Sequence, residues 1–155
     1  MKRLFTSLLV VLLFAGCKPD TAKSDSTTLP IVGTWQLIKG MTVEKKDTTV
    51  TDYTQKTSFI KIINADHFAF LKHDLNKGKD TATASFVAGG GRYTLADSVY
   101  TEHLEYCSDR QWEGNDFSFT ITIKNDTLVQ TGIEKVESAG VNRLNMEQYV
   151  RIKNK

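Results

Sequence analysis

The stretch Gly33-Thr34-Trp35-Gln36-Leu37 decides how the rest of the chain is interpreted. Gly33, Trp35 and Leu37 stand at alternate positions, so in an extended strand their side chains share one face. This strand is predicted to run from Ile31 to Lys39 and to end at Gly40. A tryptophan on the inner face of the first strand gives later strands a centre to close around.

The clearest strand further along is predicted over residues 116–124. Its apolar side chains, Phe117, Phe119, Ile121 and Ile123, alternate with Ser118, Thr120 and Thr122. Asn125-Asp126 then has the composition of a tight turn into a strand over 127–137. This pattern is typical of an antiparallel hairpin.

Further strands are predicted at 58–63, 67–73, 81–88, 92–95, 98–107 and 146–153. Phe86 is expected to point inward, and Gly89-Gly90-Gly91 to break its strand as a bulge or a sharp corner. Residues 41–56 are expected to form a solvated hairpin, or alternatively a lid over one mouth, and 141–146 to hold a turn of helix. Short strands joined by tight turns predict one all-β domain, an up-and-down antiparallel barrel of about 8–10 strands.

Several motifs support a comparison with known families. They are Gly33-Thr34-Trp35, residues 61–70, 91–95 with 100–103, 126–132, and 147–151. In this order they resemble the lipocalin-like (calycin-type) lipoproteins of Gram-negative bacteria, most of which have no assigned function. The resemblance covers nearly all of residues 31–153. It implies a structural signature of Gly33, Trp35 and Arg151, in which Arg151 stacks on the tryptophan.

The first sixteen residues are predicted to be a leader that is removed. Met1-Lys2-Arg3 is basic, residues 4–14 are apolar but too short to span a bilayer comfortably, and small residues precede Cys17. This end resembles a bacterial lipobox, which implies cleavage before Cys17 and lipid on its thiol and on the new N-terminus. Lys18 follows, with no aspartate to suggest retention in an inner membrane. The expected location is therefore the outer membrane, with its face left open.

Residues 17–30 are predicted to be a flexible tether, and residues 31–155 the barrel domain. Without Lys2 and Arg3, the chain has 18 basic and 18 acidic side chains. A near-zero charge argues against a nucleic-acid partner, which requires a concentrated basic face. Once Cys17 is lipidated, only Cys107 remains, so the fold has no intramolecular disulfide and Cys107 is expected to be a small buried residue.

Aromatic side chains and a few charges are the candidate lining of the barrel. Tyr100, Glu102 and Tyr106 share one face of their strand, and Arg92 is the long cation expected near Glu102. Two alternatives stay open for this carboxylate: an anchor for a ligand head group, or an internal ion pair. The predicted ligand-binding residues are Phe68, Phe70, Arg92, Tyr93, Tyr100, Glu102, Tyr106, Phe117 and Phe119.

Metal binding, cofactor binding and catalysis have little support in the sequence. His67 and His73 are about 20 Å apart along one strand. His103 with Glu105 supplies too few ligands for a tight site. No hydrolase elbow, zinc-protease motif or phosphate-binding loop is present. No catalytic residue, metal ligand or cofactor is therefore predicted.

Two functions from different classes follow. In the first, the anchored barrel binds a small apolar or amphipathic ligand. In the second, a barrel with a filled interior serves as a protein-interaction or inhibitor module of the cell envelope, with a partner that the sequence does not identify. Trp112 is expected at the barrel mouth, as a portal, a partner contact or a plug. The choice rests on whether the interior is open, because a fold does not fix a function.

Overall fold

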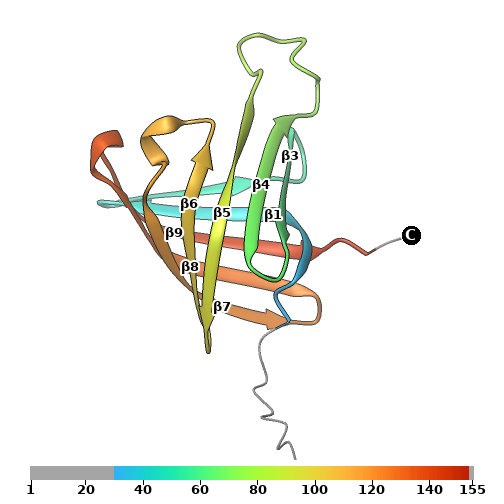
Figure 1. Ribbon diagram of the computed structural model, residues 1–155. Coiled ribbons are helices and arrows are strands. Elements are labelled where there is room, and N and C mark those ends of the chain that lie inside the picture. The colour runs from blue at the N-terminus through green and yellow to red at the C-terminus, as the bar shows by residue number, and fades with distance from the viewer. Residues whose placement is uncertain (1–29, 154–155) are drawn as a thin grey trace, which may run out of the picture.

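The computed structural model describes residues 30–153, in which nine strands form one antiparallel sheet (Figure 1). The strands are β1 (Gly33–Glu44), β2 (Asp47–Asp52), β3 (Thr57–Ile63), β4 (His67–Asp74), β5 (Phe86–Ala96), β6 (Val99–Cys107), β7 (Asp116–Lys124), β8 (Thr127–Val136) and β9 (Val141–Arg151). Two short 3₁₀ turns, η1 (Arg110–Trp112) and η2 (Glu137–Ala139), follow β6 and β8. None of these residues forms a helix long and apolar enough to cross a membrane.

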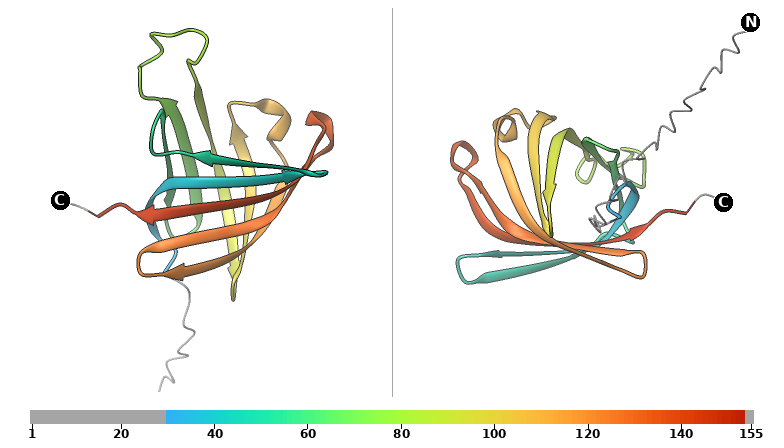
Figure 2. Two further views of the ribbon diagram at one scale, coloured as in Figure 1. Left: turned by 180° about the vertical axis from the view of Figure 1, so that it is seen from behind. Right: turned by 60° about the horizontal axis from the view of Figure 1, so that its bottom comes forward.

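The sheet closes because β1 pairs with both β3 and β9. Strands β3 to β9 follow one another as antiparallel neighbours, so β1 and β3–β9 make a closed eight-stranded barrel. The extra strand β2 pairs only with the second half of β1 and lies at the outside of the sheet (Figure 2). The prediction of an all-β, up-and-down antiparallel barrel is confirmed.

A bulge in β1 changes which side chains face inward. Trp35 pairs with Arg151 and Leu37 with Tyr149, but the pairing then shifts so that Ile38 has no partner on β9. An extra residue reverses the alternation of faces. Trp35 and Leu37 are therefore buried before the bulge, whereas Gly40 is buried after it.

The barrel end around Trp35 is filled by side chains. Trp35 is completely buried, and its Nε1 donates to the Ile31 carbonyl oxygen at 2.8 Å. The Arg151 guanidinium carbon lies 4.1 Å from the centre of the indole ring, the arrangement that the resemblance implies. The same guanidinium occupies the space that a Cβ on Gly33 would need, and Gly33 has φ +148°. The buried neighbours at this end include Leu37, Ile63, Phe68, Tyr100, Ile121 and Leu128.

Two predictions about individual segments are wrong: the end of the first strand at Gly40 and the turn of helix over residues 141–146. β1 does not end at Gly40 but continues to Glu44, turns at Lys45 (φ 56°) and pairs with β2. The hairpin expected as one alternative for 41–56 is observed, and every residue of β2 is exposed. Residues 141–146 are not helical; they begin β9 and pair with β8. Pairing across the closed barrel extends both strands beyond their local sequence pattern.

The prediction that a strand over 81–88 breaks at the three glycines is wrong, whereas the predicted bulge is observed in the pairing of β5 with β6. Residues 81–83 form a turn, and β5 begins at Phe86, which is 66% exposed. The strand then runs unbroken through the glycines, and the bulge lies opposite Gly90 and Gly91 on β6. A Cβ on Gly90 would collide with the Phe68 carbonyl oxygen, and one on Gly91 with that of His103. The glycines thus allow close approach of the neighbouring strands rather than ending the strand.

Trp35→Ala is expected to lower the free energy of unfolding by about 3–5 kcal/mol, because it removes a fully buried indole at the filled end. Urea denaturation followed by circular dichroism measures the loss. Tyr106→Ala is the control: this aromatic is 68% exposed, so its removal should change stability by less than about 0.5 kcal/mol. Equal midpoints for Trp35→Ala and the parent chain would contradict the packing described here.

Candidate functional site: an open cavity with a polar interior

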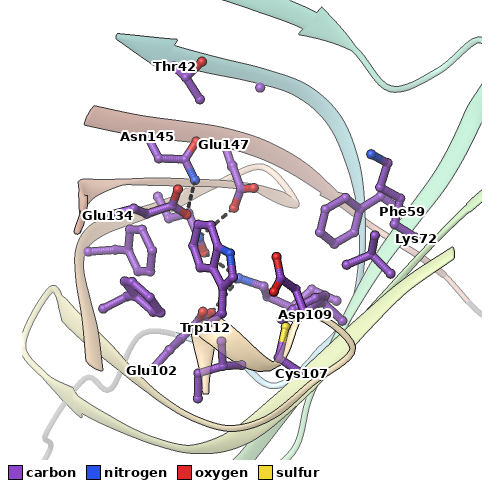
Figure 3. A pocket seen from close by; sticks show the side chains of 18 of the residues that line it. Thr42, Phe59, Lys72, Glu102, Cys107, Asp109, Trp112, Glu134, Asn145 and Glu147 are labelled. Atoms are coloured by element: carbon purple, nitrogen blue, oxygen red, sulfur yellow. Dashed lines mark hydrogen bonds and ion pairs between the residues drawn. The ribbon is translucent and has the colours of Figure 1, made fainter. Parts of the chain in front are cut away.

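The other end of the barrel encloses a cavity of about 650 Å³. It opens beside η1, whose Trp112 stands in the cavity opening in Figure 3. Its apolar lining includes Tyr53, Phe59, Phe70, Phe86, Leu104, Trp112, Phe117 and Phe119. Its polar lining includes Lys61, Lys72, Glu102, Asp109, Gln130, Glu134, Arg143, Asn145 and Glu147. The volume is in the range of sites for small molecules.

A buried ion pair lies at the floor of the cavity. Lys61 on β3 and Glu102 on β6 meet with 2.6 Å between Nζ and Oε1, and their side chains are only 3% and 8% exposed. Burial raises the pKa of Glu102, and the charge of Lys61 opposes that rise. Of the alternatives for Glu102, the internal pair is observed, but with Lys61 rather than Arg92. Each charge needs the other, because an unpaired buried ion is costly.

A hydrogen-bonded chain extends from this pair across two more strands. Lys61 Nζ also donates to Gln130 Oε1 at 3.1 Å, and Gln130 Nε2 donates to Glu147 Oε2 at 2.8 Å. The Tyr149 hydroxyl donates to the same Glu147 oxygen at 2.6 Å. Burial, followed by the charge of Glu147, raises the pKa of Tyr149 well above its usual value. Tyr149 therefore acts as a donor at any ordinary pH.

A second charged group lies nearer the mouth. Arg143 on β9 contacts Glu134 on β8 through Nε and Nη2, both at 2.7 Å. Asn145 donates to the other Glu134 oxygen at 2.8 Å. The guanidinium also lies over the Trp112 ring, 5.6 Å from its centre, and Trp112 packs against Phe117. Trp112 is thus held at the mouth as part of the lining.

The structure places the predicted ligand-binding residues in three environments. Phe70, Glu102, Phe117 and Phe119 line the cavity. Phe68 and Tyr100 are buried at the filled end, where Tyr93 packs on Tyr100 with ring centres 5.2 Å apart. The Tyr100 hydroxyl has no hydrogen-bond partner among the described residues, and burial, followed by the charge of Glu102, raises its pKa. These three aromatics lie outside the cavity lining.

Arg92 and Tyr106 lie on the outside of the barrel. The Arg92 side chain is 70% exposed and pairs with Glu105 at 2.7 Å, which raises the pKa of the arginine further. The bulge lies on β6: Gly90 pairs with Tyr106 but Gly91 with Leu104, which leaves Glu105 as the extra residue. The alternation reverses there, so Tyr106 turns outward and Cys107 lines the cavity.

Most of the polar lining was missed from the sequence, although a signal for it existed. Phe59 and Ile63 are apolar at alternate positions, which places Lys61 between them on the inner face. Gln130, Glu134, Asn145 and Glu147 follow the same alternation on their strands. An assumption that inward positions are apolar hid these residues.

The remaining candidates lie at other places. His67 pairs with Asp66 and His103 with Asp116, both at exposed positions. Among residues 30–153, no three His, Cys, Asp or Glu side chains are grouped to hold a metal ion. Cys107 is a free, partly buried thiol whose pKa is raised, mainly by burial. The leader, Cys17 and the tether before Pro30 lie outside the described residues.

The fold and cavity define a small closed antiparallel barrel with an accessible interior. The chain belongs to the family described as "Domain of unknown function (DUF4488)", whose model matches residues 30–155. No curated protein matches it. A crystal structure of an uncharacterized protein from Bacteroides eggerthii DSM 20697 is similar, with 12% identity and a TM-score of 0.47, over 78% of this chain and 98% of that one.

Lys61→Met is expected to destabilise the barrel by about 3–5 kcal/mol at neutral pH, because it leaves Glu102 buried without a cation. Loss of Lys61 raises the pKa of Glu102 further, so the folded variant binds a proton that the unfolded chain releases. Stability then falls as pH rises between the ordinary carboxyl pKa and this raised value. Urea denaturation at neutral pH and at about pH 5 should show part of the loss recovered in acid.

The double variant Lys61→Met/Glu102→Leu is the matched control. It removes both charges, so it should lose much less stability than Lys61→Met alone. A double variant as unstable as the single one, or a loss that is the same at both pH values, would show that the pair is not the source of the effect.

Proposed function

We propose that this protein is a membrane-anchored, lipocalin-like binding protein that holds a small amphipathic molecule inside its barrel. The observation that carries the proposal is the open cavity of about 650 Å³, with aromatic side chains at its mouth and hydrogen-bonding groups at its floor. Binding pockets for small molecules combine apolar walls with a few convergent polar groups. An apolar body would lie against the rings and a polar group would reach the floor.

An interaction or inhibitor module with a filled barrel is the other candidate. One end of the barrel is indeed filled, but the lining of the other end includes small residues, such as Gly40 and Thr42 on β1. Larger apolar side chains there would fill the space. The open interior therefore favours a ligand over a solid barrel, and no particular protein partner is proposed.

Binding without catalysis is part of the proposal. Cys107 is one nucleophilic side chain in the cavity lining, and burial raises the pKa of its thiol. A raised pKa leaves little thiolate near neutral pH, and the thiolate is the reactive form. We also propose no bound cofactor and no nucleic-acid partner, the latter because the charge of the mature chain is balanced.

The proposed location is the outer membrane of a Gram-negative bacterium, through lipid on Cys17. Support comes from the basic, apolar and small-residue order of residues 1–16 before Cys17. Several acyl chains give stable anchoring where one does not. The polar residues 18–30 would then serve as a spacer between membrane and barrel.

Loss of the Cys17 thiol is expected to release the protein from the membrane. Cys17→Ser cannot carry the thioether-linked lipid, so the full-length chain should move from the membrane fraction to other fractions. Cell fractionation with immunoblotting measures this, and Cys107→Ser, which retains Cys17, should stay with the membrane. Membrane retention of Cys17→Ser at the parent level would contradict the anchor.

A bulky residue at Thr42 is expected to abolish ligand uptake. Thr42 lines the cavity, whereas Thr122 is exposed on β7, so Thr42→Trp and Thr122→Trp form a matched pair. Residues 18–155 include every described strand and are expected to fold without the leader. Native mass spectrometry of this chain from bacterial cells should show a bound small molecule in the parent and in Thr122→Trp, but not in Thr42→Trp. A clean ligand-free mass for the parent, with no uptake of added amphiphiles, would contradict the proposal.

A further inference from the structure

The polar lining of the cavity contains one more carboxylate than cations. Lys61, Lys72 and Arg143 face Glu102, Asp109, Glu134 and Glu147. Inside the cavity, Lys61 is paired with Glu102 and Arg143 with Glu134. None of the ion pairs within residues 30–153 includes Glu147. Of the two carboxylates left outside these pairs, Asp109 is exposed at the mouth, so Glu147 is the unpaired carboxylate of the interior among residues 30–153.

The hydrogen bonds of Glu147 leave one of its oxygens free. Gln130 and Tyr149 both donate to Oε2, at 2.8 and 2.6 Å, and both donors are neutral. Oε1 accepts no hydrogen bond from the described residues, and Glu147 lines the cavity. Figure 3 shows its carboxylate on the wall that also carries Asn145 and Glu134. The two bonds to Oε2 hold the carboxylate in place while Oε1 stays available to a ligand.

The negative charge of Glu147 affects the pKa values of the surrounding side chains. Burial is the main cause of the raised pKa of Glu102, of Glu134 and of Tyr53, and the negative charge of Glu147 contributes to the rise in each case. A cation placed beside Glu147 would relieve this repulsion, whereas an anion would add to it. The interior thus distinguishes ligands by the sign of their charge.

Aromatic rings complete a suitable environment for an organic cation. Tyr53, Phe59 and Phe70 form one connected group, with ring centres 5.8 and 5.9 Å apart, and all three line the cavity. The faces of such rings attract cations, and their area accommodates an alkyl or aryl body. Lys61 already makes such a cation–π contact, since its Nζ lies 5.3 Å from the centre of the Tyr149 ring.

We propose that the cavity selects an organic ammonium ligand, whose charged nitrogen binds Glu147 Oε1 and whose apolar body packs against the rings at the mouth. This inference rests on the proposed ligand-binding function and names the class of ligand. Glu147 is the specificity-determining residue. Lys61 and Arg143 stay with their own carboxylates and do not compete for it.

The test compares three probes with the same apolar body: octylamine, octanol and octanoate. Isothermal titration calorimetry on residues 18–155 at neutral pH should show octylamine binding about tenfold or more tightly than octanol, as expected for a charge-assisted hydrogen bond in a cavity, and octanoate binding weakest. Glu147→Gln keeps an oxygen for Gln130 and Tyr149 but removes the charge. It should reduce octylamine affinity to about that of octanol while changing octanol affinity by less than about threefold.

Glu44→Gln is the matched control, because it makes the same carboxylate-to-amide change at an exposed position outside the cavity lining. It should retain the preference for octylamine. Thermal unfolding of each variant checks that the barrel is intact, and Thr42→Trp reports whether a probe binds inside the cavity. Loss of the preference in Glu147→Gln, together with its retention in Glu44→Gln, supports the proposal.

The contrary outcomes are distinct. Octanol or octanoate binding as tightly as octylamine, in a way that Thr42→Trp blocks, would overturn the cation selectivity but leave ligand binding in place. Retention of the octylamine preference in Glu147→Gln would overturn the role of Glu147. Absence of binding by all three probes, with no molecule carried from cells, would overturn the ligand-binding function itself and this inference with it.

Discussion

Closure of the sheet by the pairing of β1 with β9 is the constraint on which the rest of the structure depends. β1 pairs with β3, β2 and β9 along its length, and the shift at Ile38 lets it serve both ends of the barrel. Before the shift it contributes Trp35 to the filled end, and after it Gly40 and Thr42 to the cavity. One extra residue thus divides the interior into a packed half and an open half.

The polar floor follows from that division. Large apolar side chains fill the packed half of the barrel. In the open half, hydrogen bonds join Lys61, Glu102, Gln130 and Glu147 in one chain. A buried ion pair is weak evidence for stability, because apolar residues of similar size would serve as well. The arrangement is more easily understood as a lining for a polar group than as a device that stabilises the barrel.

Much of the fold could be predicted because strand alternation is a local property. The predicted strand at 116–124 matches the structure, and so does the turn after it, in which Asn125 and Asp126 both have positive φ. The outward direction of Tyr106 and the exposure of Phe86 could not be predicted in this way, because a bulge on β6 and the turn before β5 decide them. The partner of Glu102 was equally hidden: Lys61 lies 41 residues away in sequence, and only barrel closure brings the two together.

Glu147 shows how the same reasoning leads from fold to chemistry. Its strand position is fixed by the pairing of β9 with β1 and β8, and its orientation by donors from Gln130 and Tyr149. Lys61 and Arg143 are already paired with other carboxylates, and Oε1 of Glu147 accepts no hydrogen bond from residues 30–153. A preorganised acceptor gains most from a ligand that brings its own positive charge, because the cost of orienting the carboxylate has been met in folding.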